Sequence, residues 1–101
     1  MSREIDLEIV YMDILPPVEE LKERTLYISK RFGVSKHLCG CGCGLLTVLP
    51  FDHIINGVNH GWRLIEKDGL VSFTPSVGNF SWDRPSYHAH YYITDNKIRF
   101  V

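Results

Sequence analysis

The three cysteines constrain this chain most, because all of them lie in one short segment, residues 37–44, where they alternate with glycines. Cysteines two positions apart cannot build a disulfide framework, and the chain offers them no other partner. Glycine can take positive φ, so several thiolates can converge on one point instead of lining one face of a strand. The segment is therefore typical of a metal-binding loop, with buried or redox-active thiols as the alternative.

A metal in this loop needs a further ligand from outside it, because zinc is usually held by four groups. Histidine is the natural candidate, and the chain contains five. His37 begins the loop, whereas His88 and His90 lie two positions apart in a predicted strand, which turns both side chains toward the same face. The residues alone leave the choice among these three open.

The segments on either side of the loop predict strands. Apolar and polar residues alternate over 5–11, and the stretches 25–29 and 45–49 are rich in strand-forming residues. Between the first two, residues 18–24 follow a proline pair and carry acidic residues first and basic residues last, which favours a short helix. The cysteine loop is therefore expected to join two strands.

The carboxyl-terminal half predicts two hairpins. Residues 62–73 have an Asp-Gly turn at 68–69, and residues 89–101 have an Asp-Asn turn at 95–96. The connection over 74–85 is expected to be long and irregular, and such loops often carry function.

Length and composition place all of this in one domain over residues 1–101, because 101 residues at 45% hydrophobic content suit a single core. The expected fold class is mainly β, a small antiparallel sheet or barrel-like domain of about seven strands with one short helix and a zinc-binding cysteine loop. The residues expected in the core include Leu26, Ile28, Leu46, Val48, Leu64, Val71, Phe73 and Ile93.

The charge balance argues against polyanionic partners. Lys and Arg number 11 against 12 Asp and Glu, a formal net charge of -1, so no overall field draws the chain to nucleic acid or to an anionic membrane. Apolar runs are far shorter than the roughly 20 residues that span a bilayer, and no export signal is visible. We expect a cytoplasmic protein that binds neither nucleic acid nor membrane.

Residues 74–79 have a different character. Pro75 and Gly78 favour an irregular backbone, while Ser76 and Asn79 supply short polar groups that can face a developing oxyanion. The same residues are equally typical of a turn in which Ser and Asn bond to their own backbone. Taken alone, the segment favours the turn.

Four segments, taken in order, resemble a family of small bacterial proteins. Its members are encoded beside ubiquitin-like, E1-like and E2-like proteins and are proposed to be metal-binding peptidases that act on the ubiquitin-like modifier. The resemblance covers most of the chain, from Leu26 to Val101. The segments are His-Leu-Cys-x-Cys-Gly-Cys-Gly at 37–44, Gly-Trp-Arg-Leu at 61–64, Val-Ser-Phe-Thr-Pro-Ser-Val-Gly-Asn at 71–79 and Ala-His-Tyr-Tyr-Ile at 89–93.

The resemblance implies a set of site residues. Ser76 matches the serine of the family's Pro-Ser-Ile/Val-Gly motif. Family members often carry a further cysteine shortly before the motif histidine, but residues 85–89 contain none, so either a ligand is lost or His88 takes its place. The implied cofactor is Zn2+, and its predicted ligands are Cys39, Cys41, Cys43 and His90.

The favoured hypothesis is a zinc-dependent peptidase that processes or deconjugates a ubiquitin-like protein. A zinc ion with three protein ligands acidifies a bound water and directs it at a carbonyl group. Ser76 or Asn79 would steady the oxyanion, and a side chain such as His88 or Asp83 would move the proton. The predicted catalytic residues are Ser76 and His88.

The alternative is a non-catalytic, zinc-stabilised binding module that docks a ubiquitin-like protein or its E1 and E2 enzymes. A structural metal is a common stabiliser of domains this small, which favours such a module. A redox thiol protein is the third possibility, but the chain lacks the usual C-x-x-C at the start of a helix.

Overall fold

The computed structural model describes residues 4–80 and 87–101, and these residues form eleven strands and one 3-10 turn. The turn, η1, covers Val18–Glu20. The strands are β1 (Glu4–Asp6), β2 (Glu8–Tyr11), β3 (Thr25–Ser29), β4 (Val34–Leu38), β5 (Leu46–Pro50), β6 (Ile54–Ile55), β7 (Val58–Asn59), β8 (Arg63–Lys67), β9 (Leu70–Phe80), β10 (Tyr87–Thr94) and β11 (Lys97–Phe100).

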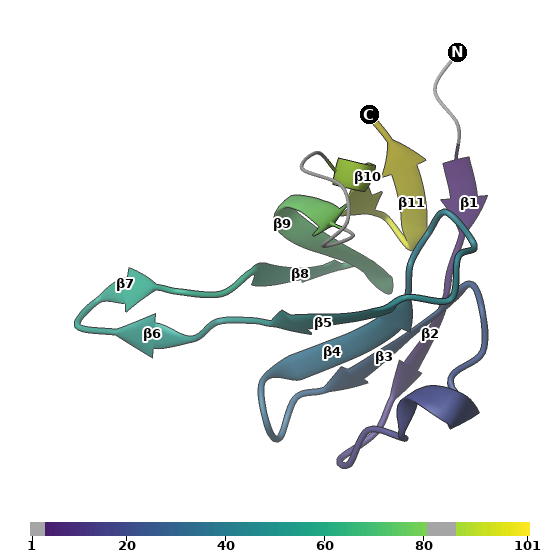
Figure 1. The fold of residues 1–101 in the computed structure, drawn as a ribbon. Coiled ribbons are helices and arrows are strands. Elements are labelled where there is room, and N and C mark those ends of the chain that lie inside the picture. The colour runs from purple at the N-terminus through teal and green to yellow at the C-terminus, as the bar shows by residue number, and fades with distance from the viewer. Residues whose placement is uncertain (1–3, 81–86) are drawn as a thin grey trace.

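Two sheets make up the body of the molecule (Figure 1). One sheet has the strand order β1-β11-β10-β9-β8, and the other has the order β2-β3-β4-β5. The β6–β7 hairpin projects away from both, as Figure 1 shows. All strand pairs among the described residues are antiparallel except β2 with β3. The predicted fold class, mainly β with antiparallel sheets, is confirmed, with more strands than expected.

Both predicted hairpins are present. β8 and β9 are joined by Asp68 and Gly69, which have φ of 53° and 76°, and β10 and β11 are joined by Asp95 and Asn96, with φ of 50° and 61°. Two successive residues at positive φ are typical of the type I′ turn, whose twist matches that of the strands it connects. The short polar side chains and the glycine make this conformation accessible.

The predicted helix is shorter than the sequence indicates. The sequence predicts a helix over residues 18–24, but only Val18–Glu20 are helical, because Leu21 already has extended dihedrals, φ -75° and ψ 134°. Leu21 is also buried, so the chain leaves the helix where its first large apolar side chain reaches the core. No helix among the described residues is long and apolar enough to cross a membrane.

The core lies between the two sheets, and most of the predicted core residues belong to it. Leu64 packs against it from a partly buried position. Two predictions are wrong, because Leu46 and Val48 are 37% and 44% exposed. Successive strand residues face opposite sides, and in β5 it is Thr47 and Leu49 that face inward. The predicted residues that are buried are Leu26, Ile28, Val71, Phe73 and Ile93.

Residues 74–80 continue strand β9, where the sequence predicts an irregular connection. β8 pairs with β9 only as far as Thr74, whereas β10 continues alongside β9 to Phe80. Pro75 has no N–H to donate, and it stands just where β9 no longer has a partner on the β8 side. The remainder of the predicted connection, residues 81–86, lies outside the described part of the chain.

Candidate active site and metal centre

Ser76 and His90 lie side by side on neighbouring strands. In the β9–β10 register His90 is opposite Gly78, so Ser76 is its diagonal neighbour. The Ser76 Oγ atom is 2.8 Å from the His90 Nε2 atom, and both residues are partly buried. A hydroxyl within hydrogen-bond reach of an imidazole is the arrangement in which a serine can lose its proton as it attacks a carbonyl carbon.

An irregularity in β9 explains this placement. Val77 is opposite Tyr91 and Phe73 is opposite Ile93, so residues 74–76 on β9 face a single residue on β10. Extra residues in one strand bend it locally and redirect a side chain, which is why such bulges are common beside active sites. Ser76 is the last residue of this segment, directly before regular pairing resumes.

The other face of the same two strands belongs to the core. Val77 and Tyr91 are buried, and they are the chain neighbours of Ser76 and His90, so strand alternation turns the two pairs toward opposite faces. Asn79 is buried on the core face as well. The serine and the histidine therefore lie on the outer face of the sheet.

A buried polar network occupies the core face. The His37 Nε2 atom is 2.6 Å from the Tyr91 Oη atom, and the Asn79 Nδ2 atom donates to Tyr91 Oη at 3.3 Å and to Thr47 Oγ1 at 3.0 Å. The side-chain amide of Asn79 therefore lies in the core, where it gives the buried hydroxyl of Thr47 a hydrogen-bond partner. The prediction that Asn79 can steady an oxyanion finds no support in this position.

Burial sets the ionisation of this network. It lowers the pKa of His37 to about 4 and raises the pKa of Tyr91 to about 12, because both charged forms lose their hydration. The His37 Nδ1 atom is buried and has no hydrogen-bond partner among the described residues. Both side chains are therefore neutral near pH 7.

The cysteine loop brings its three sulfurs together. The sulfur atoms of Cys39, Cys41 and Cys43 all lie within 4.8 Å of one another, and those of Cys39 and Cys41 are 3.4 Å apart. Two sulfurs bound to one tetrahedral zinc ion lie about 3.8 Å apart, since each Zn–S bond is about 2.3 Å long. The spacing of the three sulfurs therefore suits a single metal ion.

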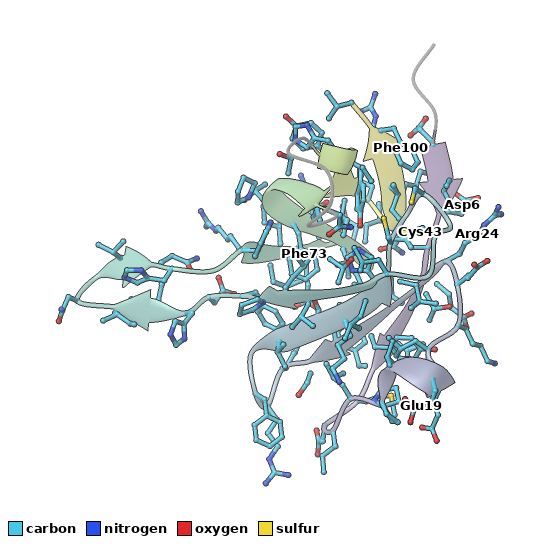
Figure 2. The ribbon with its side chains drawn as sticks, in the orientation of Figure 1. Asp6, Glu19, Arg24, Cys43, Phe73 and Phe100 are labelled. Carbon is cyan, nitrogen blue, oxygen red and sulfur yellow. The ribbon has the colours of Figure 1, made fainter. Side chains whose placement is uncertain are left out.

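Glycines allow the loop to take this shape. The N–H of Gly42 donates to the carbonyl of Cys39 at 3.1 Å in a turn where Gly42 has φ of 87°. At Gly40, a Cβ atom would lie 2.9 Å from Cδ1 of Ile98 in β11, so glycine is needed for the loop to approach that strand. Figure 2 labels Cys43 on the side of the molecule where β1 and β11 lie.

The electrostatics of the loop favour a cation. Burial raises the pKa of Cys39 to about 12. Burial acts in the same direction on Cys41, but hydrogen bonds from Cys43 and Cys39 outweigh it, so the pKa of Cys41 is lowered. The pKa values of these two neighbouring thiols are thus shifted in opposite directions. A bound cation would stabilise all of the thiolates, because it supplies the positive charge that the loop itself lacks.

The predicted site residues separate into two groups. The three cysteines gather, and neither His37 nor His90 is in the group of possible metal-binding residues found among the described residues. The structure pairs His90 with Ser76 instead. His88 lies in β10, but its side chain is outside the described part, as is the whole of Asp83.

The comparison with protein families identifies the family of this chain. A family model described as "Bacterial ubiquitination-like system serine protease (BubE)" matches residues 11–101. The chain belongs to the BubE family. The chain matches no curated protein and no solved structure. The family predicted from the sequence motifs and its bacterial ubiquitination-like setting are thereby confirmed, and the family is described as one of proteases.

BubE membership also corrects the predicted chemistry. The zinc metallopeptidase expected from the sequence is wrong, because BubE proteins are described as serine proteases. A metallopeptidase attacks with a metal-bound water, whereas a serine protease attacks with a hydroxyl that a base deprotonates. Ser76 and His90 can each be identified in the sequence, but their contact cannot, because 14 positions separate them and only strand pairing brings them together. The signal was their presence in two separate motifs of one family.

Proposed function

We propose that this chain is a serine protease in which Ser76 is the nucleophile and His90 is the general base. The observation that carries this proposal is the 2.8 Å contact between Ser76 Oγ and His90 Nε2 in a member of a serine protease family. This role for His90 replaces the metal-ligand role predicted from the sequence. Both side chains are partly buried on the outer face of the sheet, which leaves a substrate access to them.

The proposed reaction has two halves. Ser76 Oγ attacks the carbonyl carbon of the scissile bond while its proton passes to His90 Nε2, and the tetrahedral intermediate collapses when that proton moves to the leaving amine. The product is an ester between Ser76 and the amino-terminal part of the substrate. Water then attacks the ester carbonyl and gives one proton to His90 Nε2, and this proton returns to Ser76 as the carboxylic acid product leaves and loses its remaining proton to solvent.

The proposed substrate is a ubiquitin-like protein, cleaved after its carboxyl-terminal tail or released from a conjugate. The description of the family as part of a bacterial ubiquitination-like system supports this choice. In such a system the same modifier is handled by E1-like and E2-like enzymes, which are therefore the proposed partners of this protein.

For the cysteine loop we propose a structural zinc ion held by Cys39, Cys41 and Cys43, with a fourth ligand from outside the loop to complete the tetrahedron. The three close sulfurs support a metal ion, and thiolates are ligands that zinc favours. Cys39 is buried with the core, and the core face of β10 is opposite to the face that carries His90. A bound zinc ion would supply a crosslink that holds the loop against the sheet, and the proton transfer would remain with Ser76 and His90.

Covalent labelling tests the catalytic assignment. A fluorophosphonate probe should label the wild-type protein on Ser76, and neither Ser76→Ala nor His90→Gln should react at more than a few per cent of that rate. Ser72→Ala is the matched control, because it removes another partly buried hydroxyl from β9, one that accepts a hydrogen bond from the Asp95 N–H. Labelling that persists in Ser76→Ala, or no labelling of the folded wild-type protein, would contradict the proposal.

Cleavage of a precursor tests the substrate. A ubiquitin-like precursor with a tail beyond its terminal glycine should be cut by the wild-type protein and by Ser72→Ala, but not by Ser76→Ala. A wild-type protein that binds the precursor without cutting it would instead indicate the non-catalytic binding module.

A further inference from the structure

Among the described residues, one edge of strand β9 next to Ser76 has no neighbouring strand. β8 pairs with β9 from Leu70 to Thr74 and ends there, whereas β9 continues to Phe80 with β10 on its other side. In the described part of the chain, no strand pairs with the β8-side edge of residues 76–80. A strand edge of this kind presents backbone donors and acceptors in a row.

The direction of these backbone groups follows from the pairing of β10. The carbonyl of His90 accepts a hydrogen bond from the N–H of Val101, so the backbone of His90 faces β11. Backbone direction alternates along a strand, so Tyr91 faces β9 and its opposite residue Val77 faces β10. Ser76 and Gly78 therefore direct their N–H and C=O groups away from β10, toward the uncovered edge.

One side-chain contact supports this assignment. The Nε1–H of Trp62, which lies directly before β8, donates to the carbonyl of Ser76 at 3.3 Å. This carbonyl therefore points to the β8 side of β9. For Gly78, no hydrogen bond to its N–H or C=O is found among the described residues on that side.

We propose that this edge, at Ser76 and Gly78, binds the main chain of the substrate as an added strand. The inference rests on the proposed function, since it takes Ser76 as the nucleophile. The occupant is an extended peptide segment that includes the scissile bond, because the edge and the attacking hydroxyl belong to the same residue. Gly78 lies opposite His90 and has no side chain, so its position adds no bulk to the outer face beside the two catalytic groups.

This arrangement predicts how the substrate is recognised. Ser76 and Gly78 are two positions apart, and an added strand uses the backbone of every second residue. Main-chain hydrogen bonds supply most of the binding, so the enzyme accepts any tail that is extended and flexible enough to reach the edge. Recognition by side chains alone would show no such alternation.

A series of N-methylated peptides tests this alternation on the unmodified enzyme. The probe is a peptide that spans the cleavage site of the ubiquitin-like precursor, prepared with one backbone amide methylated at a time. Methylation at alternate positions should raise KM at least tenfold, while methylation at the positions between them should change it less than about twofold. The proposal would be overturned if methylation left KM unchanged at every position, or if it raised KM equally at consecutive positions.

A pair of proline variants tests the same edge from the enzyme side. Gly78→Pro removes the N–H that points to the substrate, and it should lower kcat/KM for the peptide at least tenfold, mainly through KM. Val48→Pro is the matched control in β5, a terminal strand of the other sheet among the described residues. The N–H of Phe51 donates to Gly33 on the β4 side, so the backbone of Val48, three positions earlier, faces away from β4. Its kcat/KM should change less than about twofold. If Gly78→Pro fails to fold by circular dichroism, the peptide series decides.

The two proposals fail in different ways. Wild-type protein that does not react with the fluorophosphonate overturns the assignment of Ser76 and this inference with it. If the wild-type protein does react but shows no alternation among the methylated peptides, only the proposal that the β9 edge binds the substrate is overturned.

Discussion

The Nε2 atom of His37 lies 2.6 Å from the Oη atom of Tyr91, across the core from one sheet to the other. His37 is in β4, the strand that leads into the cysteine loop, and Tyr91 follows His90 in β10. One buried hydrogen bond therefore connects the strand before the proposed metal centre to the strand that carries the proposed base. Asn79 bonds to the same hydroxyl from β9.

Removal of that hydroxyl should destabilise the protein. Tyr91→Phe leaves His37 and Asn79 each with one partner fewer in a fully buried site, and buried polar groups that lose a partner cost about 1–3 kcal/mol. The free energy of unfolding should fall by about that amount in urea denaturation. Tyr92→Phe, the neighbouring residue at 48% exposure, is the control and should stay within about 0.5 kcal/mol of wild type. Equal effects of the two substitutions would mean that the network contributes nothing.

The stability of the fold should depend on pH through His37. Burial lowers its pKa to about 4 from an ordinary value of 6.5, so the unfolded chain takes up this proton at a higher pH than the folded protein does. The stability that comes from keeping His37 neutral is fully present above pH 6.5, and it is lost as the pH falls from 6.5 to about 4. A pKa difference of this size between the unfolded and folded states corresponds to about 3 kcal/mol of unfolding free energy.

A matched variant isolates this effect. In His37→Gln the proton-binding group is gone, so the variant should lose less stability than the wild type between pH 7 and pH 4.5. The difference between the two proteins cancels groups that they share, the three cysteines included. Parallel pH curves for wild type and variant in urea denaturation would contradict the assignment.

The strands and hairpins could be predicted because their signals are local. Alternation of apolar and polar residues and the turns at 68–69 and 95–96 each act over a few neighbouring positions. The inward face of β5 could not be predicted the same way. Thr47 is buried because Asn79, 32 positions away, donates to its hydroxyl, and that partner cannot be read from the strand itself.

The same difference between local and long-range signals applies to the candidate site. The cysteines are close in sequence, so their gathering was predictable. The pairing of Ser76 with His90 depends on the register between β9 and β10 and on the extra residues near Pro75, and both are long-range properties. Without that pairing, the sequence indicates His90 as a metal ligand and Ser76 as a catalytic group that steadies the oxyanion, which favours the wrong class of protease.

The two faces of β5 offer a direct test of its register. Leu49 is buried at 1% exposure, so Leu49→Ala should cost about 2–5 kcal/mol through lost contacts and a residual cavity. Val48→Ala, on the exposed face, should change stability by no more than about 0.5 kcal/mol. Thermal and urea unfolding of both variants measure this difference. A larger loss for Val48→Ala would place the opposite face of the strand in the core.

Metal removal should affect stability more than it affects the reactivity of folded protein. Elemental analysis of purified protein should give one zinc ion per chain, and Cys41→Ser should retain much less. Chelation should lower the thermal midpoint, because the loop then loses its crosslink while its thiols still need ordering. The fluorophosphonate rate, divided by the folded fraction from circular dichroism, should remain within about twofold of wild type, since Ser76 Oγ and His90 Nε2 contact each other directly. A folded, metal-free protein that no longer labels would show that the metal takes part in catalysis and would contradict a purely structural ion.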